Sequence, residues 1–145
     1  LDDTGDPNNS PQGGAERFLA FLEARLKPAI ADRFPIDARR SALLGHSYGG
    51  LFTLYTLLEH PGAFRDYIAV SPSLWWDDQA ASKAAPALLA QHDDAERHLY
   101  LTMADEGGTM QAGLDRLKSM VRRSSNIVMS TARVSTSSLT PSLSR

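Results

Sequence analysis

Short apolar runs alternate with segments of helical periodicity through most of this chain. Three runs are too short and too apolar to be half exposed, so they predict buried strands at residues 41–44, 66–71 and 98–103. Apolar spacing of three and four residues predicts helices between and around them, at residues 15–34, 50–59, 80–91 and 110–121. Strands that alternate with helices indicate an α/β fold, built as a parallel sheet with helices on both faces.

One proline interrupts the first of these helices. Pro28 lies inside the segment 15–34, where Phe18, Leu22 and Leu26 recur at every fourth position. Because proline has no backbone N–H and fills the space of the preceding turn, we expect Pro28 to kink this helix or to remove one hydrogen bond.

Both ends of the chain depart from this alternation. Residues 1–14 are rich in Gly, Pro, Asn and Asp, and the chain opens on Leu1, so we expect that the true N-terminus has been lost. Of the 24 residues from 122 to 145, eleven are Ser or Thr. We expect a partial domain over residues 1–121 and an atypical tail over 122–145, either disordered or frameshifted, where another strand would belong.

The composition excludes several classes of site. With no cysteine among 145 residues, the chain cannot form disulfides, thiolate metal sites or a cysteine nucleophile. A net charge of −2 gives no indication of a nucleic-acid or anionic-membrane partner, and no apolar run has the length of a transmembrane helix. We expect no metal and no cofactor, and the compartment, cytoplasmic or periplasmic, stays open.

The pentapeptide Gly45-His46-Ser47-Tyr48-Gly49 is the motif that carries chemistry. It is a G-x-S-x-G sequence that follows a predicted strand and precedes a predicted helix, an arrangement typical of a nucleophile elbow. Such a turn exposes the serine hydroxyl at the carboxyl end of the strand. The alternative is a Gly-Ser turn that matches by chance; we interpret Ser47 as a nucleophile, with the backbone N–H of Tyr48 as an oxyanion donor.

Acidic residues follow the third predicted strand. Asp105 comes directly after it and is the candidate acid of a Ser–Asp–His arrangement, with Glu106 as its rival. Carboxyl ends of parallel strands share one edge, where ligands bind, so these residues should lie near Ser47. The alternative, which the sequence supports equally, is that these two residues belong to a solvent-exposed acidic loop with no catalytic role.

Aromatic residues follow the second predicted strand. Trp75 and Trp76 are either core aromatics or a wall against a flat aromatic substrate at the same edge. His46 is a further candidate for substrate contact. It adjoins Ser47 in so sharp a turn that its side chain should diverge from the serine oxygen.

None of the four histidines suits the role of general base. His60 and His98 should lie roughly 20 Å and 17 Å from Ser47, at the far end of the helix and of the third strand. His92 precedes that same wrong end of the strand. We therefore expect the base to come from sequence not present here, and this chain alone not to turn over esters.

Four segments resemble a known family. They are Gly13-Gly14-Ala15-Glu16-Arg17-Phe18, Asp37-Ala38-Arg39-Arg40, Gly45-His46-Ser47-Tyr48-Gly49-Gly50-Leu51-Phe52 and Ser71-Pro72-Ser73-Leu74-Trp75-Trp76. In this order they are similar to the Putative esterase (esterase D-like) family of α/β-hydrolases, which includes ferric-enterobactin and salmochelin esterases. The resemblance implies a three-layer α/β-hydrolase-like sheet with flanking helices, incomplete at both ends, of which residues 1–121 form the C-terminal half.

The same resemblance implies a reaction. Enzymes of this group hydrolyse the ester bonds of a cyclic trilactone siderophore, so the substrate would be a small-molecule ester such as a ferric catecholate siderophore. Ser47 would be the nucleophile, Tyr48 the oxyanion donor and Asp105 the acid. The family's early strands and its C-terminal Gly-x-x-His segment have no counterpart here. A non-catalytic fragment or binding protein is the main alternative, and an acyltransferase of the same fold is another.

Overall fold

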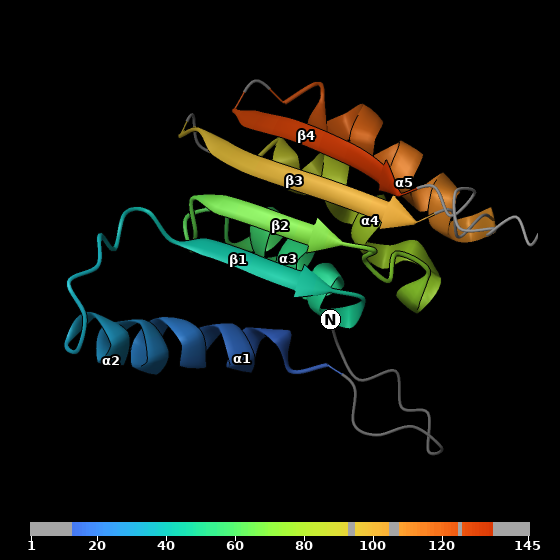
Figure 1. Cartoon of the computed structure of the whole chain (residues 1–145). Coiled ribbons are helices and arrows are strands. Elements are labelled where there is room, and N and C mark those ends of the chain that lie inside the picture. Colours follow the sequence, from blue (N-terminus) through green and yellow to red (C-terminus); the bar gives the residue numbers. More distant parts are fainter. Residues whose placement is uncertain (1–12, 93–94, 105–107, 125, 135–145) are drawn as a thin grey trace, which may run out of the picture.

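Within the part of the chain that the structure describes, four parallel strands form one sheet (Figure 1). The computed structural model describes residues 13–92, 95–104, 108–124 and 126–134. The strands are β1 (Ala42–His46), β2 (Asp66–Val70), β3 (Arg97–Ala104) and β4 (Ile127–Val134), paired in the order β1-β2-β3-β4. The three strands predicted from the apolar runs are confirmed, with bounds shifted by one or two residues.

The fourth strand corrects the prediction for the end of the chain. We expected residues 122–145 to be an atypical tail, either disordered or frameshifted. Disorder is wrong for residues 127–134, because β4 pairs with β3 along eight residues, from Ile127 opposite Arg97 to Val134 opposite Ala104. The reason lies in Ile127 and Met129, which point to the buried face of the sheet and outweigh the Ser/Thr-rich composition. The frameshift and the domain boundary after residue 121 stay predictions. Residues 135–145 lie outside the described part of the chain.

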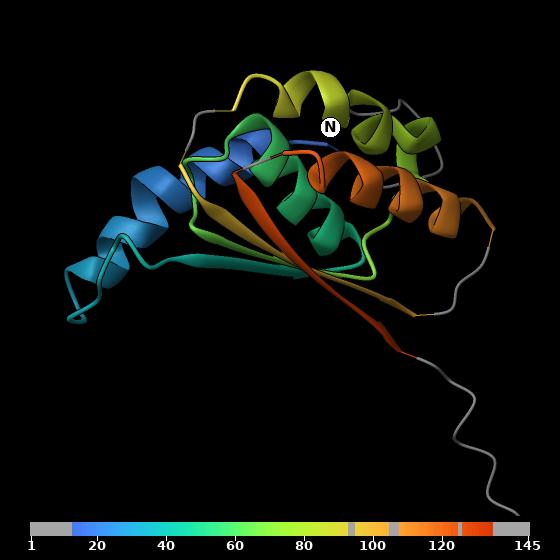
Figure 2. The ribbon, with the colours of Figure 1, turned by 90° about the horizontal axis from the view of Figure 1, so that it is seen from above.

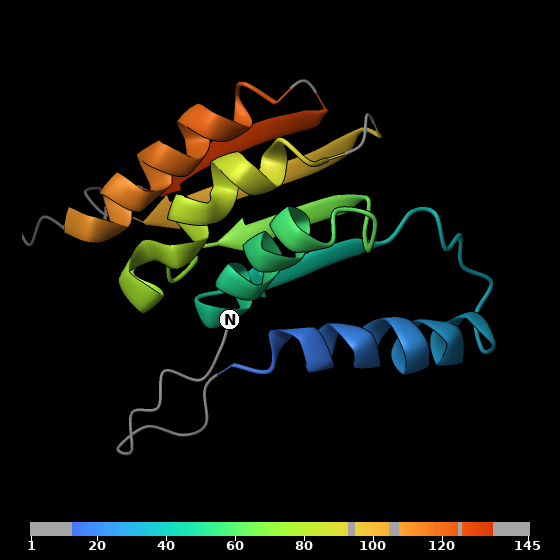
Figure 3. The same cartoon turned by 180° about the vertical axis from the view of Figure 1, so that it is seen from behind.

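Three helices cover one face of the sheet. They are α3 (Tyr48–Glu59), α4 (Trp76–Leu89) and α5 (Gly108–Val121). Figure 2 shows all three on the same side of the strands, and Figure 3 shows them lying in front of the sheet when it is seen from behind. Helices on both faces were expected; within the described residues the other face carries none.

Side-chain burial follows this one-sided arrangement. Odd-numbered strand residues point toward the helices and form the core, and four of them are at most 1% exposed, namely Tyr67, Ala69, Leu99 and Leu101. Even-numbered residues point to the opposite face, where Leu44 is 65%, Tyr100 42% and Val128 51% exposed. The sheet is therefore apolar on both faces, as parallel sheets are, but packed on only one.

The first helical segment is continuous but changes its winding. It consists of α1 (Ala15–Phe21), the π-helical segment η1 (Leu22–Leu26) and α2 (Lys27–Ala31), with Pro28 in the first turn of α2. A π-helical turn directly before Pro28 accommodates a ring that has no N–H to donate, so the expected disturbance appears as a local change of hydrogen bonding.

Across the residues that the structure describes, no helix has the length and apolarity needed to span a membrane.

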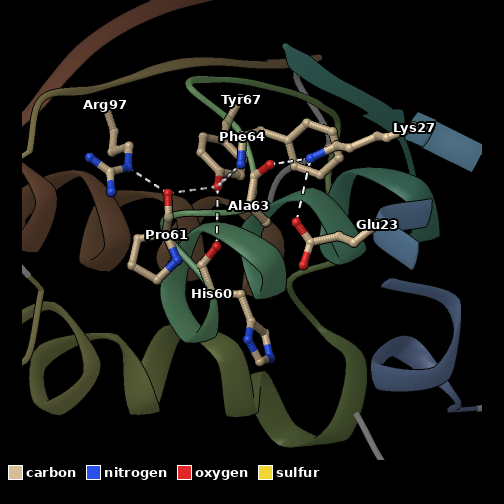
Figure 4. Close-up of polar contacts among 8 residues, drawn as sticks. All are labelled: Glu23, Lys27, His60, Pro61, Ala63, Phe64, Tyr67 and Arg97. Atoms are coloured by element: carbon tan, nitrogen blue, oxygen red, sulfur yellow. Dashed lines mark hydrogen bonds and ion pairs between the residues drawn. The ribbon is translucent and has the colours of Figure 1, made fainter. Parts of the chain in front are cut away.

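The loop from α3 to β2 is fastened at the amino end of the strands (Figure 4). The buried Tyr67 hydroxyl accepts a hydrogen bond from the Phe64 N–H at 3.1 Å and lies 3.1 Å from the Pro61 carbonyl oxygen. Arg97 donates to the same Pro61 carbonyl, and the Lys27 ammonium donates to the carbonyl of Ala63. Burial raises the pKa of Tyr67 to about 12.

Candidate functional site

Ser47 lies between the end of β1 and the start of α3. Its backbone has φ 56° and ψ −117°, a left-handed conformation that costs free energy for a residue with a side chain. The end of β2 and the first turn of α3 hold it there, because its N–H donates to the Val70 carbonyl (3.0 Å) and its carbonyl accepts from the Leu51 N–H (3.0 Å). The predicted strand–turn–helix location is thus what the structure shows, with Ser47 half-buried at the carboxyl end of the strands.

Two glycines make this turn possible. A Cβ on Gly45 would lie 2.0 Å from the Gly49 carbonyl oxygen, so the strand and the helix approach too closely for any other residue. A Cβ on Gly50 would lie 2.9 Å from the carbonyl oxygen of Val70, at the end of β2. Gly49 has no atom within 4 Å of such a Cβ, so its space is open. The close approach of strand and helix therefore requires glycine at position 45 but not at position 49.

The first turn of α3 directs backbone N–H groups toward this edge. Tyr48 is its first residue, so its N–H is among those that have no partner inside the helix. The positive end of the helix dipole lies at the same point, which favours negative charge beside Ser47. This arrangement suits an oxyanion donor, and the role of Tyr48 stays a prediction.

The two tryptophans lie in different environments. Trp75 is 48% exposed and meets the ring of Tyr48 edge-on, with 5.8 Å between the ring centroids. Trp76 is 6% exposed and packs in the interior, so of the expected pair only Trp75 offers a surface to a ligand. The three residues after them, 77–79, all have positive φ angles, so a left-handed turn separates Trp75 from the body of α4.

The proposed acids lie beyond the described residues. β3 ends at Ala104, and Asp105 and Glu106 fall in the undescribed range 105–107, so their roles stay predictions. His46 is exposed and, two residues after Leu44 in β1, shares the uncovered face of the sheet. Its contact with a substrate also stays a prediction.

The other three histidines all lie at the opposite end of the sheet from Ser47. His60 follows the last residue of α3 and bonds Glu16 (2.9 Å), and His92 bonds the carbonyl of Leu58 (3.0 Å) near that same helix end. His98 is paired in register with Asp66, the first residue of β2. None of them lies beside the Ser47 hydroxyl.

Sequence reasoning missed one contact of Ser47. The Ser73 hydroxyl oxygen lies 3.2 Å from the Ser47 hydroxyl oxygen, and Ser73 is only 3% exposed. The available signal was the Ser71-Pro72-Ser73 sequence after the second strand, which belongs to one of the four segments that resemble the family.

Comparison with known proteins identifies a family for this chain. A sequence model of the family described as "Putative esterase" matches residues 3–136. The chain belongs to this family. Its fold agrees, since a crystal structure of the BES protein from Bacillus cereus superposes on 94% of this chain and 52% of its own, with a TM-score of 0.80 and 29% identity.

Named relatives are similar to about half of this chain. The siderophore triacetylfusarinine C esterase of Aspergillus fumigatus is 46% identical over 78 residues, which are 53% of this chain and 27% of that protein. The ferri-bacillibactin esterase BesA of Bacillus subtilis is 52% identical over 65 residues, which are 45% of this chain and 22% of that protein. The matched segments thus cover about a quarter of the length of these two relatives.

Proposed function

We propose that this chain carries the nucleophilic part of a serine hydrolase that cleaves carboxylic esters. The observation that carries the proposal is the conformation of Ser47, a left-handed residue at the start of α3 and at the carboxyl end of a parallel sheet. Strain of this kind persists only where the surrounding structure holds it, and it is concentrated at functional sites. Membership of the esterase family supports the same reaction class.

The chemistry follows from the positions of the groups. The Ser47 hydroxyl oxygen attacks the ester carbonyl carbon, and its proton passes to a general base. The carbonyl oxygen becomes negatively charged beside the start of α3, where the Tyr48 N–H is placed to donate a hydrogen bond. The alcohol leaves with a proton, and water then releases the acid from the acyl-serine and restores Ser47.

For the substrate we propose a siderophore ester of the enterobactin trilactone type. Relatives are named Siderophore triacetylfusarinine C esterase and Siderophore enterobactin esterase, and the exposed ring of Trp75 beside Tyr48 supplies a flat apolar surface suited to an aromatic acyl group. An esterase acting on another acyl group would use the same Ser47 chemistry, so substrate and reaction are tested separately.

The first experiment tests the nucleophile. The protein expressed from its complete gene should react with a fluorophosphonate probe and hydrolyse p-nitrophenyl butyrate, and Ser47→Ala should abolish both. Loss of turnover by about 10⁴-fold or more is expected when the attacking oxygen is removed. Unchanged turnover by Ser47→Ala would refute the proposal, and products formed with an added acceptor alcohol would reveal acyl transfer instead of hydrolysis.

The second experiment tests the prediction that the general base lies outside these 145 residues. A polypeptide of residues 1–145 should show no serine-dependent turnover, because three of its four histidines lie at the other end of the sheet and His46 points to the uncovered face. A non-catalytic binding protein is the alternative that this arrangement favours. It predicts that the complete protein is inactive too, whereas a hydrolase gains turnover when the remaining sequence is restored.

A further inference from the structure

A second serine is built against the proposed nucleophile. The segment after β2 turns sharply at Ser71, which has φ 40°, and runs through the buried Pro72 to Ser73. This path passes directly over α3, since a Cβ on Gly50 would lie 3.0 Å from the Pro72 Cα. Gly50 is therefore the residue that lets the segment come close enough for Ser73 to reach Ser47.

Ser73 is joined to Ser47 twice. Its N–H donates to the Ser47 carbonyl oxygen at 3.2 Å, and its hydroxyl oxygen lies 3.2 Å from the Ser47 hydroxyl oxygen. The first bond holds the strained backbone of the nucleophile, and the second holds its side chain. With 3% exposure, Ser73 is also shielded from the water that would otherwise compete for its hydroxyl.

We infer that Ser73 is a positioning residue for the Ser47 nucleophile, an inference that rests on the proposed function. When the Ser47 proton points to the general base, the Ser73 hydroxyl can donate to the Ser47 oxygen and fix its rotamer toward the substrate. The same hydrogen bond strengthens as negative charge develops on that oxygen during attack. Ser73 forms no covalent bond and takes up no proton; its effect is on the orientation and reactivity of Ser47.

A purely structural serine would behave differently, and the readouts separate the two. The number of probe molecules bound per protein at saturation measures how much protein is correctly folded. The rate constant of labelling at each folded site measures the reactivity of Ser47. A structural role for Ser73 changes the first quantity, whereas a positioning role changes the second.

The experiment compares Ser73→Ala and Ser73→Cys with the unsubstituted protein, each expressed from the complete gene. For Ser73→Ala we expect the fluorophosphonate labelling rate constant to fall by about 10- to 100-fold, with the final stoichiometry unchanged. Ser73→Cys keeps a weaker donor in nearly the same volume and should give an intermediate rate. The pH midpoint of labelling should stay the same, because the base is another group.

The matched control is Ser82→Ala. Ser82 is a fully buried serine whose hydroxyl donates to the Gly113 carbonyl at 3.4 Å, between α4 and α5, so its removal deletes the same atom away from Ser47. It should label at the unsubstituted rate. A Ser73→Ala rate within twofold of the unsubstituted rate, or a loss confined to stoichiometry, would overturn the inference. Absence of labelling in the unsubstituted protein would instead refute the proposed function and this inference with it.

Discussion

The two ends of the sheet are built in opposite ways. At the amino end, the hydroxyl of the buried Tyr67 and the side chains of Arg97 and Lys27 bond the backbone of the loop that leads into β2 (Figure 4). At the carboxyl end, backbone strain is gathered at Ser47 and Ser71, and the rings of Tyr48 and Trp75 are half exposed. One end satisfies its backbone groups, while the other holds strained residues and presents side chains.

This contrast indicates how one small sheet can serve stability and function together. Residues in left-handed conformations persist only if the rest of the structure holds them, so strain at one end requires a firmly packed framework elsewhere. The amino-end network supplies part of that framework, since it fixes where α3 ends and β2 begins. Substitutions at the two ends should therefore separate stability from activity.

The largest effect is expected where the close approach at the carboxyl end is blocked. In Gly45→Ala, the new Cβ would lie 2.0 Å from the Gly49 carbonyl oxygen, so the turn that carries Ser47 must open. We expect a loss of about 3 kcal/mol or more in the free energy of unfolding, together with loss of probe labelling. Urea denaturation and fluorophosphonate labelling measure the two effects.

Gly49→Ala is the matched control for that prediction. Its Cβ would have no neighbour within 4 Å, and alanine favours a helix by up to about 1 kcal/mol over glycine. This variant should be at least as stable as the unsubstituted protein. Equal losses for Gly45→Ala and Gly49→Ala would show that the close strand–helix approach is not what holds the turn.

The sequence allowed the position of Ser47 to be predicted because its cause is local. Gly45 and Ser47 lie within three residues of each other, and apolar runs on either side determine a strand and a helix. Strands β1, β2 and β3 could be predicted for the same reason, since each is a short apolar run bounded by turn residues.

The features that were missed depend on distant partners. β4 could not be predicted from its Ser/Thr-rich sequence, because its formation depends on pairing with β3 and on burial of Ile127. The contact between Ser47 and Ser73 joins residues 26 positions apart, and the Ser71-Pro72-Ser73 sequence does not by itself show which distant residue it meets. Trp75 and Trp76 look alike in sequence, and only packing against the core distinguishes the exposed ring from the buried one.

A smaller effect, on stability alone, is expected at the amino end. Tyr67→Phe removes a hydroxyl that accepts from the buried Phe64 N–H, which is then left without that partner. We expect a loss of about 1–3 kcal/mol in the free energy of unfolding, with the labelling rate of Ser47 per folded molecule unchanged. Tyr100→Phe, at the 42% exposed ring on the uncovered face, should change stability by less than about 0.5 kcal/mol.

The pH dependence of the stability difference between Tyr67→Phe and the unsubstituted protein gives a further test of this prediction. Because burial raises the pKa of Tyr67 to about 12 from the ordinary value of 10.0, its contribution to stability is complete below pH 10 and is lost as the pH rises toward 12. The stability difference between the unsubstituted protein and Tyr67→Phe should narrow across this interval. A constant difference would mean that the neutral hydroxyl is not the stabilising group.

The smallest effect is expected at His98, which resembles a catalytic histidine only in its hydrogen-bond partners. His98 bonds the Asp66 carboxylate through Nδ1 at 2.6 Å, as the base of a catalytic triad bonds its acid, and it also bonds Glu96 through Nε2 at 3.2 Å. Yet His98 pairs with Asp66 in register, whereas Ser47 bonds Val70, four residues further along β2. At about 3.3 Å per residue, His98 and Asp66 therefore lie roughly 13 Å from Ser47, measured along the strand.

His98→Gln should therefore leave the labelling rate of Ser47 within twofold of the unsubstituted rate. Its effect on the free energy of unfolding should stay below about 1 kcal/mol, because ion pairs open to solvent contribute little. The readouts are fluorophosphonate labelling and urea denaturation of the complete protein, with Asp66→Asn as the matched substitution in the partner. A fall of tenfold or more in labelling by both variants would contradict the separation of the two ends, because it would require His98 and Asp66 to act on Ser47 across the length of the strand.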